Sequence, residues 1–520
     1  MRILLGFCFA AVTLVGQMKD ISGTWVAKYP PPMDEQEIIY QLQILGGHIT
    51  GMQRMPFGDS PIIDGKVEGK KFRTTVAPDY FGTLEKREVR GRIVGDTLEL
   101  EPAVPAPPGL LRKHDPGASA GWIDGPVILH RGTPSPTYRA PMVDYSSLPQ
   151  FGLPPAQDLA DNGMAPTPPM GWSSRDAFHT QMDGKTVREA ADAMVASGMR
   201  DAGYVYLNLD DGWQGQRDAN GVLRPNPGFP NMKALADYVH SKGLKLGIYS
   251  SPGPRTCGGF EGSYGHEELD AWTWAGWGID LVKYDWCSAA RIWSDDDMRA
   301  VYQILGAAIR KTGRPMVYSI CQYGRGNVAE WGPLAGGNLW RTGVNIGDRW
   351  ESMAAAAIAE SEMAGFAGPG HWNDPDLLEV GKGGMTEVEY RTQFSLWAML
   401  AAPLIAGTDV REMAPETRAI LLNKEAIAVD QDRLGRVASV VSSTRTTQVW
   451  ARPLADGSYA VALFNPSEAE AQVSVSWDDL HETGAFYVRD LWAHADRGRL
   501  WSGYGATVPA HGVAMVRLTR

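Results

Sequence analysis

The sequence is poor in cysteine, with only four among its 520 residues. No Cys/His spacing resembles a metal site, so a metal centre built on these ligands is not expected. Outside the N-terminus the chain also lacks any apolar run approaching the 18 residues of a transmembrane helix. It has no basic surplus either: 49 basic and 60 acidic residues give a net charge of −11. This balance argues against nucleic acid and anionic membranes as partners.

The N-terminus, MRILLGFCFAAVTLVGQ, has one arginine followed by an apolar run. The run of roughly 14 residues is too short to span a bilayer and has the length of a signal-peptide core. A buried first strand is the alternative. We interpret residues 1–17 as a signal cleaved near Gly16 or Gln17, and we expect the mature protein to be secreted or periplasmic.

Cleavage would remove Cys8 and leave Cys257, Cys287 and Cys321. An odd number of cysteines in an exported protein indicates one disulfide and one remaining thiol. Cys257 and Cys287 each follow a predicted strand, so a bridge between two neighbouring loops is consistent with their positions. Cys321 lies in the apolar segment PMVYSIC and is expected to be a buried free thiol.

The first region after the signal, residues 18–133, consists of short alternating runs separated by glycine-rich turns. This pattern predicts an additional N-terminal all-β domain, either a small barrel or a sandwich, of unknown role. Its Trp25 and Tyr80 either bind polysaccharide or belong to the core. Residues 134–155 are rich in proline and are predicted to be a linker.

Residues 156–432 alternate between strand-like and helix-like segments, with PPMGW as the first strand and PLIAGTD as the last. Eight such units predict an α/β fold, a (β/α)8 barrel, as the catalytic domain. Residues 437–520 contain only strand-like runs and predict a C-terminal antiparallel β-sandwich.

The segment LVKYDWC is the most informative part of the central region. Lys283 and Asp285 are two residues apart, so on a strand their side chains point to the same face. An isolated pair of this kind is usually an ion pair at a strand end, but other predicted strands also end in polar residues. These residues are Asp210, Asp211, Tyr249, Arg341, Asn345, Asp348, Asp374 and Asp376. Polar residues gathered at the carboxyl ends of successive strands are typical of a barrel active site.

The sequence from about Leu159 to Arg520 resembles glycoside hydrolase family 27, the melibiase-like group of α-galactosidases and α-N-acetylgalactosaminidases. The resemblance rests on seven motifs in the order of the family: DNGMAPTPPMGW, LNLDDGW, YVHSKGLKLGIYS, TCGGFEGS, DLVKYDWC, AGPGHWNDPDLL and AVDQDRLG. The number and order of these motifs make the match specific. The N-terminal β region lies outside it.

The resemblance implies a role for individual residues. Asp285 matches the nucleophile that forms a covalent glycosyl-enzyme, and Cys257 and Cys287 match the family disulfide. The sugar-binding positions are matched by Trp172, Asp210, Asp211, Tyr249, Lys283, Arg341 and Asp376. The residues themselves agree with this, because a lysine close to Asp285 would favour the ionised carboxylate that attack on an anomeric carbon requires.

Two positions depart from the family pattern, and both lose a carboxylate. The general acid/base of the family lies five residues after the tryptophan of its W-R motif, which is Asn345 here. The glutamate that contacts the sugar's 2-substituent is replaced by Gln322. An asparagine cannot donate a carboxylic proton, and losing general acid/base help typically costs about 10²–10⁴-fold in rate.

Three interpretations follow from Asn345. Asp348 takes over the proton transfer, or the enzyme has an altered specificity in which the substrate or a side chain such as Asp374 supplies the proton. The third is a sugar-binding pseudoenzyme. The intact nucleophile with its lysine argues against the third, since a pure lectin needs neither.

The sequence therefore predicts a secreted, retaining exo-glycosidase that hydrolyses terminal α-D-galactosyl residues of oligo- or polysaccharides. The alternatives are a related α-N-acetylgalactosaminidase, β-L-arabinopyranosidase or isomalto-dextranase, and the pseudoenzyme. No cofactor and no metal are expected, since the carboxylates have Lys and Arg as sequence partners. The expected partner is a carbohydrate substrate, with no nucleic acid and no membrane; the sequence sets neither the aglycone nor the oligomeric state.

Overall fold

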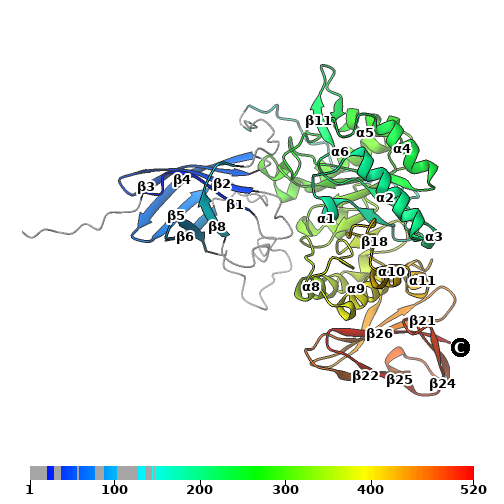
Figure 1. The fold of residues 1–520 in the computed structure, drawn as a ribbon. Coiled ribbons are helices and arrows are strands. Elements are labelled where there is room, and N and C mark those ends of the chain that lie inside the picture. Colours follow the sequence, from blue (N-terminus) through cyan, green and yellow to red (C-terminus); the bar gives the residue numbers. More distant parts are fainter. Residues whose placement is uncertain are drawn as a thin grey trace, which may run out of the picture.

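The computed structural model describes residues 20–28, 37–55, 58–76, 87–101, 127–134, 143, 145 and 147–520. The signal peptide predicted at residues 1–17, Tyr80 and part of the predicted linker lie outside these residues. Figure 1 shows three units: an N-terminal β-barrel, a central α/β barrel and a C-terminal β domain. None of the helices in the described part of the chain has the length and hydrophobicity needed to span a bilayer.

The N-terminal unit is a closed antiparallel barrel in which each strand pairs with the next and β1 pairs with β8. Of its two predicted forms, barrel or sandwich, the strands form the barrel. Trp25 is 2% exposed in its interior, so it belongs to the core. The strands are β1 (Gly23–Lys28), β2 (Glu37–Leu45), β3 (His48–Met55), β4 (Gly58–Glu68), β5 (Lys71–Val76), β6 (Arg87–Val94), β7 (Thr97–Leu100) and β8 (Val127–Arg131).

The central unit contains a parallel sheet of eight strands in the order β17-β16-β15-β14-β13-β10-β9-β18. Just beyond β17, Leu378 forms a parallel bridge with Ala406 of β18, so the two ends of the sheet meet. PPMGW and PLIAGTD supply β9 and β18, as predicted. The strands are β9 (Met170–Ser173), β10 (Tyr206–Asn208), β13 (Lys245–Ser250), β14 (Leu281–Asp285), β15 (Val317–Cys321), β16 (Leu339–Arg341), β17 (Trp372–Asp374) and β18 (Leu404–Ala406).

Helices surround this sheet, and their sequences show why they form. In α2 the Asp183 side chain caps the first turn by accepting the Thr186 amide, and Val187, Ala190 and Met194 are buried on one face. The helices are α1 (Arg175–Phe178), α2 (Gly184–Ala196), α3 (Met199–Ala202), α4 (Met232–Ser241), α5 (Glu267–Trp277), α6 (Met298–Lys311), α7 (Val328–Trp331), α8 (Trp350–Ser361), α9 (Glu387–Leu400), α10 (Pro415–Leu421) and α11 (Lys424–Asp430). A hairpin of β11 (Gln214–Arg217) and β12 (Leu223–Pro225) follows β10.

The C-terminal unit is entirely β apart from one short turn of 3-10 helix. A sheet in the order β19-β20-β21-β26-β23-β24 packs with the pair β22-β25 around a core of its own. The strands are β19 (Ser439–Ser443), β20 (Gln448–Pro453), β21 (Tyr459–Asn465), β22 (Ala471–Ser476), β23 (Phe486–Asp490), β24 (Ala495–Leu500), β25 (Gly503–Val508) and β26 (Gly512–Thr519).

The N-terminal barrel contacts the central barrel close to the end of β14. Arg291, in the 3-10 helix η2 (Ala289–Arg291), donates a hydrogen bond of 2.7 Å from Nη2 to Ser60 Oγ on β4. The same guanidinium lies over the Tyr145 ring at 5.1 Å. The N-terminal domain therefore touches the loop that directly follows Asp285.

Candidate active site

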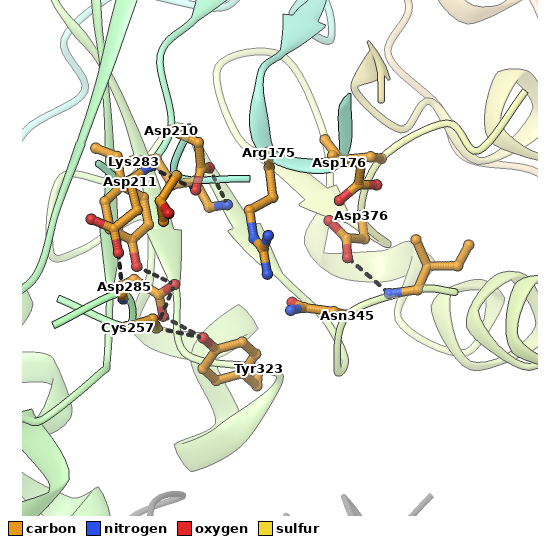
Figure 2. A pocket seen from close by; sticks show the side chains of 15 residues that line it. Arg175, Asp176, Asp210, Asp211, Cys257, Lys283, Asp285, Tyr323, Asn345 and Asp376 are labelled. Atoms are coloured by element: carbon orange, nitrogen blue, oxygen red, sulfur yellow. Dashed lines mark hydrogen bonds and ion pairs between the residues drawn. The ribbon is translucent and has the colours of Figure 1, made fainter. Parts of the chain in front are cut away.

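A pocket of about 620 Å³ opens at the carboxyl ends of the central strands (Figure 2). Strands β10, β13 and β14 each place a polar residue in it close to their carboxyl ends, as expected when parallel strands end at one face of a barrel. Its walls are formed by Arg175, Asp176, Thr180, Asp210, Asp211, Tyr249, Cys257, Gly258, Lys283, Asp285, Tyr323, Asn345, Ile346, Asp376 and Leu377.

Asp285 ends β14 and is 5% exposed. Tyr249 donates a hydrogen bond of 2.9 Å to its Oδ2, and Tyr323 one of 2.6 Å to its Oδ1. Burial raises the pKa of Asp285, while the Lys283 ammonium and the two phenol hydrogen bonds oppose that rise. The two hydroxyls thus hold the carboxylate in place, and together with Lys283 they offset part of the effect of burial.

Lys283 makes its direct ion pair with Asp210, at 2.9 Å from Nζ to Oδ2, and not with Asp285. The lysine therefore acts on Asp285 through its electric field, while the contacts of Asp285 come from tyrosines. The neighbouring Asp211 accepts the Gly258 amide at 2.6 Å. Burial, with added repulsion from Asp210 and Asp285, raises the pKa of Asp211 to about 7.

Asn345 lies on the opposite side of the pocket from Lys283 and Asp211 (Figure 2). Its Oδ1 accepts a hydrogen bond of 3.0 Å from Arg341 Nη1. Arg341 also pairs with Asp376 at 3.0 Å, and Asp376 accepts the Ile346 amide at 2.9 Å. Asp376 has a φ of 92°, in the left-handed region that a non-glycine residue rarely adopts.

Four of the predicted site residues do not line the pocket. Trp172 is fully buried and donates to the Thr408 carbonyl at 2.7 Å. Gln322 is also fully buried, and its amide donates to the Arg325 carbonyl at 3.1 Å. Arg341 lies behind Asn345 and Asp376, which it positions. The fourth is Asp348.

Asp348 points into the loop before α9. Its two carboxylate oxygens accept hydrogen bonds from the Tyr390 hydroxyl at 2.9 and 3.0 Å, and one also accepts the Gly384 amide at 2.6 Å. Asp374, the other suggested proton source, accepts the Asp376 amide at 2.9 Å and is likewise absent from the pocket wall. In this arrangement neither carboxyl occupies the position of the missing acid.

The pocket contains residues that the sequence analysis did not single out, notably Arg175, Asp176, Thr180 and Tyr323. Arg175 follows β9 by two residues and its Nη1 donates to His179 Nδ1 at 3.0 Å. Asp176 pairs with Lys382 at 2.9 Å. The polar SSRD sequence directly after the first strand is the signal that would have identified both.

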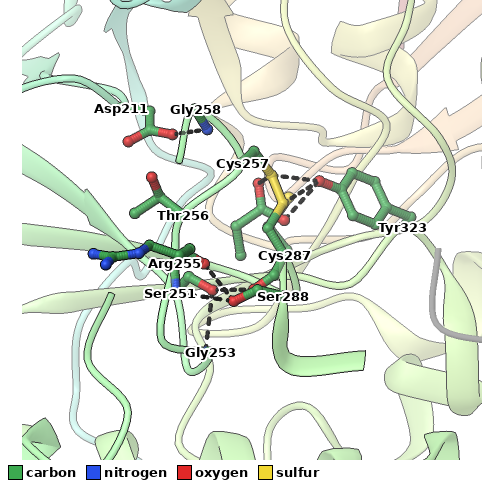
Figure 3. Close-up of a disulfide and its surroundings, with 12 residues drawn as sticks. Asp211, Ser251, Gly253, Arg255, Thr256, Cys257, Gly258, Cys287, Ser288 and Tyr323 are labelled. Carbon is green, nitrogen blue, oxygen red and sulfur yellow. Dashed lines mark hydrogen bonds between the residues drawn. A yellow bond between two sulfur atoms is a disulfide. The ribbon is translucent and has the colours of Figure 1, made fainter. Parts of the chain in front are cut away.

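A disulfide joins Cys257 to Cys287 beside the pocket (Figure 3), which confirms the predicted bond, and Cys321 is a buried free thiol. The Cys257 sulfur lies 3.5 Å from Asp285 Oδ2. Cys257, Cys287 and Asp285 form the one cluster of potential metal ligands found among the described residues. Because both sulfurs are joined in the disulfide, they do not offer the thiolates that a metal would need.

Comparison with known proteins gives consistent matches. The sequence model of the family described as "Alpha galactosidase A" matches residues 167–432, and that of the "Alpha galactosidase C-terminal beta sandwich domain" matches residues 444–518. The α-galactosidase of Cyamopsis tetragonoloba is 46% identical over 367 residues, which cover 69% of this chain and 88% of that protein.

Solved structures agree. The α-galactosidase of Saccharomyces cerevisiae with raffinose has a TM-score of 0.65 and 28% identity, covering 69% of this chain and 98% of its own. A Bacteroides fragilis structure, assigned only provisionally as an α-galactosidase, has a TM-score of 0.66 and 30% identity and covers 96% of this chain and 95% of its own. The second alignment therefore extends over the N-terminal barrel.

Proposed function

Because the chain belongs to glycoside hydrolase family 27, the α-galactosidase family, we propose that it cleaves terminal α-D-galactosyl groups from oligo- or polysaccharides with retention of configuration. The protein is a glycoside hydrolase, and its relatives support galactosides as its substrates. The observation that carries the mechanism is the Asp285 carboxylate, buried at the pocket wall with a tyrosine hydroxyl on each oxygen.

In the proposed first step an oxygen of Asp285 attacks the anomeric carbon as the glycosidic bond breaks. The electron pair of that bond stays on the leaving oxygen, and a galactosyl ester of Asp285 forms. In the second step water attacks the same carbon and loses a proton to solvent, the ester bond breaks, and Asp285 regains its charge; the leaving oxygen takes up a proton from solvent, so the reaction balances. Two displacements at one carbon give retention of the anomeric configuration.

Recognition of the galactosyl group falls to the side of the pocket that carries Asp210, Asp211 and Lys283. Two adjacent carboxyls can accept hydrogen bonds from the sugar's 4- and 6-hydroxyls, which selects an axial 4-hydroxyl. The Lys283–Asp210 ion pair holds one of these acceptors in place. We also propose export of the mature protein, supported by the apolar N-terminal segment.

The test is trapping and substitution of Asp285. An α-galactosyl fluoride with a second fluorine at C5 should leave a galactosyl adduct on the peptide that contains Asp285, identified by mass spectrometry. Asp285→Asn should abolish turnover, while Asp296→Asn, an exposed carboxylate between β14 and α6, should leave it unchanged. An adduct on another residue, or more than a few per cent activity in Asp285→Asn, would refute the assignment.

One observation favours the pseudoenzyme as a second candidate, namely the amide at Asn345 in place of the acid/base. The same trapping experiment separates the two functions. A pseudoenzyme would bind galactose, for example in calorimetry, without turning over the galactosyl fluoride, a substrate whose leaving group needs no proton.

A further inference from the structure

On the side of the pocket where the leaving group of a substrate would lie, an arginine and a neutral amide are found close together. Figure 2 shows the Arg175 guanidinium reaching from α1 into the space between Asp285 and Asn345. A retaining glycosidase needs a carboxyl there, about 5–5.5 Å from the nucleophile, to protonate the leaving oxygen. Here the two groups that border this space are a permanent cation and a neutral amide, and neither can donate a carboxylic proton.

The carboxyls of the pocket wall do not replace that acid. They are Asp176, Asp210, Asp211, Asp285 and Asp376. On Arg175's side, Asp376 is paired with Arg341. Burial alone would raise the pKa of Asp176, but Lys382 and Arg175 outweigh it and hold that pKa below its ordinary value. Asp176 is therefore ionised and unable to donate a proton at neutral pH, and the Asp376 carboxyl is engaged by Arg341 and by the Ile346 amide.

Asp211 is a pocket carboxyl that is partly protonated near neutrality, because burial raises its pKa to about 7. It lies with Lys283 on the sugar-binding side, across the pocket from Asn345 (Figure 2). Its Oδ2 is already directed at the Gly258 amide, 2.6 Å away. The proton of Asp211 is thus on the wrong side of the pocket for the leaving group.

Arg175 is held in a defined orientation. An arginine can only donate, so its Nη1 contact of 3.0 Å requires His179 Nδ1 to accept. His179 has a φ of 51°, a backbone conformation that a non-glycine residue rarely adopts. A strained residue that fixes a pocket cation is typical of a functional site.

We propose that this site cleaves galactosides whose leaving group departs as an anion, with Arg175 stabilising the charge that a proton would otherwise neutralise. The proposal rests on Asp285 being the nucleophile. When the bond from the anomeric carbon to a phosphate, or to another acidic leaving group, breaks, the electron pair remains on an oxygen that is stable as an anion. No proton transfer is then needed in that step.

Transfer of the galactosyl group from Asp285 to inorganic phosphate also needs no proton transfer. An inorganic phosphate oxygen, already anionic, attacks the galactosyl ester, the bond to Asp285 breaks, and α-galactose 1-phosphate forms without a general base. Water has to lose a proton in the equivalent step, and the carboxylates on Arg175's side, Asp176 and Asp376, are already engaged in ion pairs with Lys382 and Arg341. Phosphate should therefore compete well with water for the galactosyl-enzyme.

The first test uses two aryl α-galactosides whose phenols have matched pKa values, one of them carrying a sulfonate. The wild type should show a kcat/KM at least about tenfold higher for the sulfonate, a part of the roughly 10²–10³-fold that one oriented donor contributes to a developing anion. Arg175→Gln should lower that ratio to near one, and Arg175→Lys should keep part of it. Arg224→Gln, an exposed arginine paired with Asp218, should leave the ratio unchanged.

The second test adds inorganic phosphate to wild type turning over a neutral aryl galactoside and follows products by phosphorus NMR. Formation of α-galactose 1-phosphate supports a phosphate leaving group. Its absence, with the sulfonate preference intact, assigns the anion to an acidic aglycone. A ratio near one in the wild type, or a ratio that survives Arg175→Gln, overturns the proposal. Failure of the proposed function would look different, since galactosyl fluoride would then not be turned over through Asp285.

Discussion

Replacing Asn345 by aspartate should restore a general acid, and the surrounding charges set how much activity returns. General acid help is worth about 10²–10⁴-fold, or roughly 3–5 kcal/mol in activation free energy. The new carboxylate would lie where Asn345 Oδ1 now accepts from Arg341 at 3.0 Å. An adjacent arginine typically lowers the pKa of an aspartate by about 1–3 units, which leaves it largely ionised at neutral pH.

The lowered pKa of the new aspartate sets how the gain in activity changes with pH. The acid works only when protonated, so the gain should grow tenfold for each pH unit below neutrality until the carboxyl's own pKa is reached. We expect almost no gain at pH 7 and up to about 10²-fold near pH 5 for melibiose, whose leaving group is a sugar alcohol. Nitrophenyl α-galactoside, whose leaving group departs unaided, should change little.

The assay is kcat/KM for both substrates between about pH 4.5 and 8, in wild type, Asn345→Asp and the control Asn231→Asp. Asn231 is exposed and caps α4, a role that aspartate also performs. Thermal unfolding confirms that each variant is folded. An equal gain on both substrates, or a melibiose gain that does not vary with pH, would refute the reasoning.

Three further predictions concern the contacts of the site. Tyr323→Phe removes the 2.6 Å hydrogen bond to the Asp285 carboxylate, so the pKa of Asp285 should rise and the acidic limb of kcat/KM should move to higher pH; an unchanged limb would exclude the contact as functional. Replacing Cys257 and Cys287 by serine opens a loop of 30 residues and should lower the unfolding free energy by about 3–4 kcal/mol, measured by denaturant titration. Asp348→Asn should reduce stability and slow both leaving-group classes alike; a selective loss on melibiose would instead make Asp348 the acid.

The sequence predicted the barrel and most of the pocket because strand ends obey a simple rule. Lys283 and Asp285 are two residues apart on β14, so their side chains point to the same face. Polar residues at the ends of parallel strands converge on one site. The rule fails once a strand has ended. After β15 the chain turns through Tyr323 with a φ of 62°, so Tyr323 and not Gln322 reaches Asp285. Such a turn at a tyrosine has no sequence signal, since glycine or asparagine is the usual residue there.

Arg175 was missed for a different reason. It lies at the start of a short helix two residues beyond β9; the polar SSRD segment marks this position, but the direction of the side chain depends on a contact with His179 four residues later. Asp348 shows the opposite error, because its closeness to Asn345 in sequence suggested a shared site. The intervening turn directs its carboxylate to Tyr390 instead. The Asp348 case depends on a contact with a residue that is distant in sequence, which local patterns do not encode.

The strained backbone at Asp376 offers a way to test whether the activity of this enzyme limits its thermostability. At a φ of 92° a side-chain-bearing residue costs about 1–3 kcal/mol relative to glycine, yet its carboxylate holds both Arg341 and the Ile346 amide. Random mutagenesis selected only for resistance to heat should therefore recover Asp376→Gly among its survivors if relief of strain exceeds the loss of the ion pair. Selection for turnover at moderate temperature should never tolerate it, and the two populations of sequences would diverge first at this codon.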